Sequence, residues 1–248
     1  MAKEVAGVTG LAAYGATDTG RRRRLNEDAY CVEPGLGLLA VADGLGGHPA
    51  GEVASSLAIS LLRRHLRARL RHDDRADALD LMAEAVEAGN AAIRERMATN
   101  PLCRGMATTL TACLVKAGCA HFTHVGDSRA YLLREGRIAQ LTEDHTAASL
   151  RRRQGRGGAP GRGNPSNRRL LSALGMSSWA GMDLFVQNLR IGDVLLLCTD
   201  GLTDEIDNGE LAAACLLPLP LPERVARLLA TANDRNGADN VTIVRAEF

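Results

Sequence analysis

Residues 38–54 read LLAVADGLGGHPAGEVA, and the rest of the chain is organised around them. The apolar run 38–42 predicts a buried strand that ends where the glycines begin. Asp43 stands at that end, and Gly44 lets the backbone turn tightly beside it, with main-chain carbonyls exposed nearby. Hard divalent cations prefer such oxygen ligands, and His48, which follows, is of the one residue type that titrates near neutral pH unaided. Taken alone, the pattern is equally typical of a purely structural strand, turn and helix.

Length and composition indicate one soluble, cytoplasmic domain. The 248 residues, 46% of them hydrophobic, can bury a sizeable core within a single domain over residues 1–248. The net charge of +1 gives no general attraction to nucleic acid or to an acidic membrane surface. Six cysteines without a C-x-x-C pair predict reduced thiols. We expect neither a secretory signal nor a membrane span, since the longest apolar segment, 211–221, is interrupted by Pro218 and Pro220.

Hydrophobic periodicity predicts the secondary structure. Amphipathic helices are expected at 51–71, 76–97, 210–216 and 222–232. Short apolar runs predict strands at 11–20, 29–32, 38–42, 108–115, 121–125, 129–133, 138–141, 194–198 and 241–244. Tight turns separate the strands between 108 and 141, which predicts an antiparallel meander with Asp127 at a hairpin tip.

A segment rich in arginine, glycine and proline lies at 151–169 and predicts an irregular, mobile surface segment. Tracts of arginine and glycine also occur in proteins that bind single-stranded nucleic acid. No aromatic residue is interleaved here to stack on a base, so we expect no nucleic-acid partner.

Two further aspartates stand at strand ends, as Asp43 does. Asp200 follows the strand at 194–198, and Asp239 precedes the strand at 241–244. If these ends converge, the carboxylates disfavour one another's ionisation and raise one another's pKa. Divalent cations resolve that conflict, and all-oxygen ligands favour Mg²⁺ or Mn²⁺ over zinc.

Four consecutive arginines, 21–24, stand directly before two adjacent carboxylates, Glu27 and Asp28. Such a run is most often a solvated loop. Beside an acidic metal site, however, guanidinium groups suit an oxyanion ligand, because they bind phosphate through paired hydrogen bonds.

Several blocks, in chain order, carry a resemblance to a known family. They are Asn26-Glu27-Asp28, Asp43 to Glu52, Thr108-Thr109, His124 to Tyr131, Leu141 to His145, Thr199 to Asp204 and Asp239 to Thr242. Together they resemble the metal-dependent serine/threonine phosphatases of the PPM class (type 2C), bacterial branch, from about Tyr14 to the C-terminus. The fold that this resemblance implies is α+β, a four-layer αββα sandwich of two antiparallel sheets flanked by helices.

The resemblance also implies a metal centre with two Mn²⁺ or Mg²⁺ ions. The position of Asp43 bridges both ions in the family, and that of Gly44 contributes its carbonyl to one of them. The positions of Asp200 and Asp239 complete the shell of the first ion. A third, weaker metal position found in many members matches Asp127 and Asp204.

Other site residues follow from the same resemblance. Glu27 and Asp28 match positions that hold metal-bound waters or lie in the second shell. Arg23 matches the arginine that grips the substrate phosphate, although its arginine neighbours leave that register open. His48 matches the candidate general acid, and the segment 146–169 matches a flap that commonly sets substrate preference.

The implied activity is hydrolysis of phosphoserine and phosphothreonine in proteins by a metal-bridging water or hydroxide. The expected partners are phosphorylated proteins, namely a serine/threonine kinase and its substrates, and the expected state is a monomer. A phosphoprotein-binding pseudophosphatase is the alternative. It would lack metal aspartates, and none of the matching positions lacks one.

Overall fold

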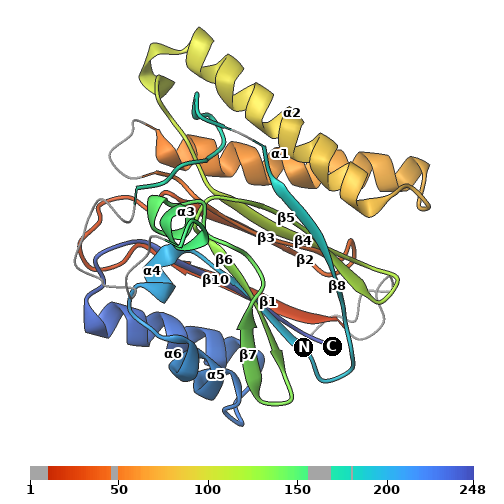
Figure 1. Cartoon of the computed structure of the whole chain (residues 1–248), viewed down its shortest axis with the longest axis vertical. Coiled ribbons are helices and arrows are strands. Elements are labelled where there is room, and N and C mark those ends of the chain that lie inside the picture. Colours follow the sequence, from red (N-terminus) through yellow and green to blue (C-terminus); the bar gives the residue numbers. More distant parts are fainter. Residues whose placement is uncertain (1–10, 46–49, 156–168, 180) are drawn as a thin grey trace.

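The computed structural model describes residues 11–45, 50–155, 169–179 and 181–248 of the chain. Two five-stranded antiparallel sheets face each other at its centre (Figure 1). The first sheet has the strand order β1 (Ala12–Asp18), β10 (Val241–Glu247), β9 (Val194–Cys198), β6 (Arg129–Arg134) and β7 (Arg137–Gln140). The second has the order β2 (Asp28–Glu33), β3 (Leu38–Asp43), β4 (Leu110–Lys116), β5 (Cys119–Val125) and β8 (Asp183–Asn188).

Helices cover the outer face of each sheet (Figure 1). The second sheet is covered by α1 (Gly51–His72) and α2 (Ala78–Thr99), and the first by α5 (Asn208–Cys215) and α6 (Leu221–Arg235). Shorter elements are η1 (Pro101–Cys103), α3 (Ala147–Arg153) and α4 (Asp200–Thr203). The predicted α+β fold with four layers is therefore confirmed.

Strand β3 is buried on both faces. Leu38, Ala40 and Ala42 pack in the cluster beneath α1 and α2. Leu39 and Val41 pack in the cluster between the two sheets. Because strand side chains alternate between faces, a strand covered on both sides needs apolar residues at every position. This double burial explains why the sequence shows an unbroken apolar run rather than an alternating one.

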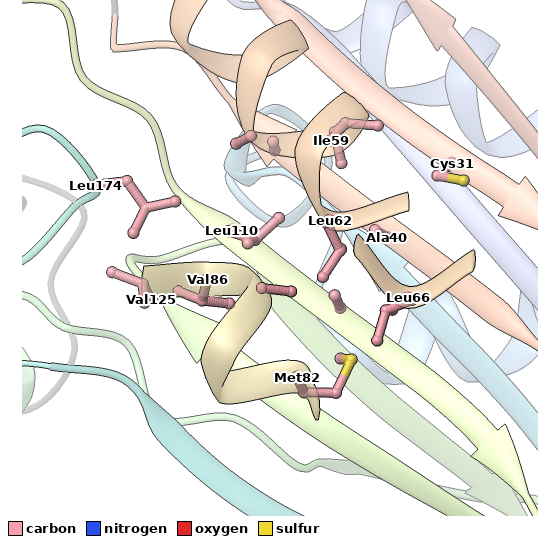
Figure 2. Close-up of a cluster of buried hydrophobic side chains, with 14 of the residues drawn as sticks. Cys31, Ala40, Ile59, Leu62, Leu66, Met82, Val86, Leu110, Val125 and Leu174 are labelled. Carbon is pink, nitrogen blue, oxygen red and sulfur yellow. The ribbon is translucent and has the colours of Figure 1, made fainter. Parts of the chain in front are cut away.

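The outer layer over the second sheet is held by the apolar faces of its two helices. Figure 2 shows Leu62 and Leu66 of α1, Met82 and Val86 of α2, and Leu110 of β4 in one cluster of buried side chains. The helical residues of each pair are four positions apart, which places them on one face of the helix. Burial of that face, more than helix propensity, keeps α1 and α2 in place.

The predicted meander is wrong at its centre. Strands β5 and β6 belong to different sheets, so residues 126–128 carry the chain from one layer of the sandwich to the other and are not a hairpin tip. Gly126 makes this crossing possible with a φ of 112°. A Cβ atom there would lie 2.5 Å from Cγ2 of Thr109, too close for any other residue. Asp127 therefore lies in the connection that joins one sheet to the other.

Two further expectations need correction. Arg151, Arg152 and Arg153, predicted to be irregular, form the last turn of α3, whose first turn is capped by the Thr146 hydroxyl. Residues 156–168 of the predicted flap lie outside the described residues. Strand β8 was not anticipated, because it is a half-exposed edge strand whose pattern is weakly apolar.

All six cysteines are free thiols, with Cys119 half-buried and the other five buried. This arrangement matches the expectation of reduced thiols in the core. Among the described helices, none combines the length and the apolar character needed to cross a bilayer.

Leu62→Ala should lower the free energy of unfolding by about 2–5 kcal/mol, because the side chain is fully buried and its removal leaves a cavity. Urea unfolding followed by circular dichroism measures the change. Leu102→Ala makes the same chemical change at a side chain that is 80% exposed, and should stay within about 0.5 kcal/mol of wild type. Equal losses in the two variants would contradict the packing described here.

Candidate metal and phosphate site

Aspartates from both sheets influence one another at one end of the sandwich. Asp43 ends β3 and lies opposite Asp28, the first residue of β2. Asp200 follows β9 as the first residue of α4, and Asp239 lies just before β10. Burial raises the pKa of Asp43 well above its ordinary value, and the negative charges of Asp28, Asp200, Asp127 and Asp239 raise it further. Contacts show that these strand ends converge: Asp28 bonds to Thr199, the residue before Asp200, and to Thr242 of β10.

The backbone of Asp43 is held by two threonines that precede β4. The main-chain N–H of Asp43 donates to Oγ1 of Thr109 at 2.9 Å. The carbonyl of Asp43 accepts from the N–H of Thr109 and from Oγ1 of Thr108, each also at 2.9 Å. Oγ1 of Thr109 and Oγ of Ser128 lie 2.7 Å apart. These bonds leave the Asp43 carboxylate as the part of the residue that is not tied to the sheet.

Asp28 presents a buried carboxylate oxygen to the site. Its Oδ2 accepts from Oγ1 of Thr199 at 2.9 Å and from Oγ1 of Thr242 at 2.6 Å. Its Oδ1 is buried and has no hydrogen-bond partner among the residues that the structure describes. Burial raises the pKa of Asp28 to about 7, although the two hydroxyls act in the opposite direction. A buried polar atom without a partner is rare in native proteins, and here it fits a cation or an ordered water.

Two glycines bring the backbone of neighbouring segments unusually close. The N–H of Gly44 donates to the carbonyl of Glu27 at 3.1 Å. A Cβ atom on Gly44 would lie 2.3 Å from the carbonyl oxygen of Gly51 and 2.6 Å from that of Glu27. A Cβ atom on Gly51 would lie 2.8 Å from Oε1 of Glu27. The glycines are therefore required by close approach, and Glu27 is held beside the end of β3.

Arg23 lies at the rim of the acidic group, a name used for Asp28, Asp43, Asp127, Asp200 and Asp239 together. Its Nη2 donates to Oδ2 of Asp239 at 2.7 Å, and its Nη1 lies 3.8 Å from Oε2 of Glu27. Its side chain is 35% exposed, so the guanidinium remains accessible to a ligand. Arg21, by contrast, pairs with Asp234 at an exposed position on α6. This geometry favours Arg23 among the four arginines as the residue that meets an anionic ligand.

Asn240 is a site residue to which sequence reasoning gave no role. Its Oδ1 accepts from the N–H of Glu27 at 2.9 Å, and its Nδ2 donates to the carbonyls of Thr19 and Leu25 at 2.8 and 2.9 Å. Asn240 thus joins the loop that carries the arginines to the start of β10. An asparagine directly after Asp239 was visible in the sequence, but its partners lie more than 200 positions away.

The remaining predicted residues fall as follows. Burial raises the pKa of Asp127 well above its usual range, and the charges of Asp200 and Asp144 add to the effect. Asp204 is the C-cap of α4, with its N–H donating to the carbonyl of Asp200 at 2.8 Å. His48 lies outside the described residues, so its role stays a prediction.

The comparison with families of known proteins bears directly on this group of residues. The model of the protein phosphatase 2C family matches residues 19–241, a span that includes every described residue of the acidic group. The chain belongs to the protein phosphatase 2C family. The resemblance found in the sequence is therefore confirmed.

Named relatives agree with the family. The chain is 39% identical over 247 residues to the serine/threonine protein phosphatase PstP of Mycobacterium tuberculosis (strain ATCC 25618 / H37Rv), covering 98% of this chain and 46% of that protein. It thus spans about half the length of this curated relative. It is 32% identical to the serine/threonine phosphatase stp of Listeria monocytogenes serovar 1/2a, covering 93% of each chain.

A solved structure of the same family is similar in three dimensions. It is the catalytic domain of the serine/threonine phosphatase PstP in complex with two manganese ions. The two chains superpose with a TM-score of 0.83 at 37% identity, covering 96% of this chain and 97% of the other.

The donor set of this phosphatase 2C chain suits a hard divalent cation that keeps part of its water. Within the described ranges, no three histidine, cysteine, aspartate or glutamate side chains are gathered closely enough to enclose a metal by themselves. Magnesium-like ions bind through one or two carboxylates and retain several waters. The carboxylate of Asp43 and the carbonyl of Gly44 are oxygen donors of that kind, and Oδ1 of Asp28 suits a water that such an ion retains.

The metal-free protein should lose stability as the pH rises from about 4 to about 7. In this window the folded chain keeps a proton on Asp28, whose pKa burial raises from 3.8 to about 7, whereas the unfolded chain has released it. Low pH favours the state that binds more protons, which here is the folded state. The free energy of unfolding therefore falls as the pH increases. Urea unfolding of chelator-treated protein at about pH 5 and about pH 7.5 measures this difference.

Asp28→Asn provides the control, because it removes one of the titrating carboxyls and should flatten the pH dependence. Saturating Mn²⁺ should remove it as well, since cations bind carboxylates in the deprotonated form. Metal-free stability that increases between these two pH values would contradict the burial of these carboxyls.

Proposed function

We propose that this chain is a metal-dependent serine/threonine protein phosphatase that hydrolyses phosphoserine and phosphothreonine in proteins. The observation that carries the proposal is the meeting of the strand ends that bear Asp28, Asp43, Asp200 and Asp239, with Arg23 bonded at their rim. Such an arrangement combines oxygen ligands for divalent cations with a guanidinium for an oxyanion. Membership of the protein phosphatase 2C family supports the same reaction.

Phosphate monoesters are among the slowest substrates to hydrolyse in water, so the site must stabilise the transition state strongly. Two bound Mn²⁺ or Mg²⁺ ions would lower the pKa of a water molecule and stabilise charge on the attacking and leaving oxygens. Asp43, Gly44, Asp200 and Asp239 are the residues proposed to hold them, and Asp127 with Asp204 the residues proposed for a weaker third ion. Glu27 and Asp28 would orient water around them.

Other residues of the chain would bind the phosphate, hold Asp43 in position and protonate the leaving group. Arg23 would bind two phosphate oxygens through its guanidinium, whose Nη2 donates to Asp239 at a partly exposed position. Thr108 and Thr109 hold the backbone of Asp43 in place through hydrogen bonds. His48 is proposed to give a proton to the leaving alkoxide, a role that contributes typically about 10²–10⁴-fold in rate.

Partners follow from the names of the relatives, which are serine/threonine phosphatases. We propose that the substrates are phosphorylated proteins and that the enzyme opposes a serine/threonine kinase in signalling. We further propose that residues 1–248 form one catalytic domain, that the segment 146–169 sets substrate preference, and that the enzyme acts as a cytoplasmic monomer.

Asp43→Asn should reduce phosphate release from a phosphothreonine peptide by more than about 100-fold, since even outer-shell partners of a metal are worth about 10–100-fold. Malachite-green assay of released phosphate with Mn²⁺ or Mg²⁺ measures the loss. Asp234→Asn is the matched control, because this aspartate pairs with Arg21 at an exposed position and should leave turnover unchanged. Full activity of the wild type in excess chelator would refute the metal-dependent mechanism.

A further inference from the structure

His145 joins three segments beside the candidate metal centre. It lies between β7 and α3, and its main-chain N–H donates to the carbonyl of Gly126 at 2.7 Å. Its own carbonyl accepts from the N–H of Leu171 at 2.7 Å. Its imidazole makes two more contacts, with Gly126 and with Asp183, the first residue of β8. One side chain therefore links the crossing at residues 126–128 to the edge of the second sheet.

The partners of the ring fix its tautomer. The N–H of Gly126 lies 3.2 Å from Nδ1 of His145, and a main-chain N–H can only donate. Nδ1 is therefore the acceptor. In the neutral ring the proton lies on Nε2, which donates to Oδ2 of Asp183 at 3.1 Å. A carboxylate that fixes the tautomer of a histidine in this way also fixes the orientation of its ring.

Two residues support the position of His145: His124, which packs against its ring, and Asp144, its neighbour in the sequence. The buried imidazole of His124 packs against that of His145 with ring centroids 4.8 Å apart. Asp144, the residue before His145, accepts two hydrogen bonds from Arg129 at 2.8 and 2.6 Å. Gly126 and Arg129 lie on either side of residues 127 and 128. His145 bonds to Gly126 and Asp144 bonds to Arg129, so these two adjacent residues hold the two ends of the crossing.

The crossing needs this support because it carries Asp127. Asp127 directly follows Gly126 and lies outside any helix or strand, so the backbone of the crossing decides where its carboxyl lies. Gly126 has a φ of 112°, and a glycine can adopt many other φ values without steric cost. A glycine with this freedom would let Asp127 change its orientation unless another group restrained the peptide.

We propose that His145 is a positioning residue for Asp127, and that its Nδ1 acts by accepting the Gly126 N–H and so holding the crossing that carries the Asp127 carboxylate. The inference rests on the proposed function, in which Asp127 contributes to a weaker divalent cation position. His145 itself touches neither substrate nor metal in this account.

Two near-isosteric variants separate the two ring nitrogens. In His145→Asn the side-chain oxygen can take the place of Nδ1 and accept from Gly126, but nothing reaches Asp183. In His145→Gln the amide can reach the place of Nε2 and donate to Asp183, but no acceptor remains for Gly126. Calorimetric titration of each metal-free protein with Mn²⁺ gives the number of sites and the affinity of each.

The expected result is a loss of about 10-fold or more in affinity at the weakest Mn²⁺ site of His145→Gln, with a smaller loss in His145→Asn, which keeps the acceptor for Gly126. The tighter sites should be unchanged in both variants. Equal weakening in the two variants, or none in His145→Gln, would overturn the proposal. Weakening of all sites together would also overturn it, because a general structural defect moves every site.

Two further variants complete the design. Asp183→Ala removes the acceptor of Nε2 without touching the histidine, and it should weaken the same site by a smaller factor. It therefore tests the proposal if His145→Gln does not fold. Asp127→Asn should abolish the weak site. If it does not, the proposed third metal position fails and the positioning role fails with it. If Asp127→Asn loses the site while His145→Gln and Asp183→Ala keep it, the positioning role alone is wrong.

Discussion

The structure depends on carboxylates that repel one another and are nevertheless buried together. Asp28 and Asp43 face each other across one strand pair, and burial raises the pKa of both. Each unit of such a shift costs about 1.4 kcal/mol when the folded carboxyl must ionise. That is a substantial share of the roughly 5–15 kcal/mol by which a domain is stable. Cations that bind the folded chain remove the cost and add stability by mass action.

Neutral donors hold this acidic group in place. Threonine hydroxyls bond to Oδ2 of Asp28 and to the backbone of Asp43, and they leave carboxylate oxygens available. Arginine or lysine in the same places would neutralise the carboxylates and compete with divalent cations. The guanidinium of Arg23 bonds to Asp239 at the rim, where it is also accessible to an anionic ligand.

The site belongs to neither sheet alone. Asp28 and Asp43 come from the second sheet, Asp200 and Asp239 flank strands of the first, and Asp127 lies where the chain crosses between them. The apolar cluster between the sheets, which includes Leu39, fixes their separation. Packing of the sandwich therefore sets the spacing of the carboxylates, and the hydrogen bonds of His145 act on the crossing that carries Asp127.

The sequence alone determined whatever depends on neighbouring residues: the double-sided burial of β3, the helical faces of α1 and α2, and the placement of Asp43 at a strand end. These features follow from side-chain periodicity, which is local. Only the tertiary structure decided that β5 and β6 lie in different sheets, that Asn240 bonds to Glu27, and that Arg23 rather than Arg21 meets Asp239. Each of these is a pairing between distant segments. Periodicity states which face of a segment is buried and leaves open which segment will cover it.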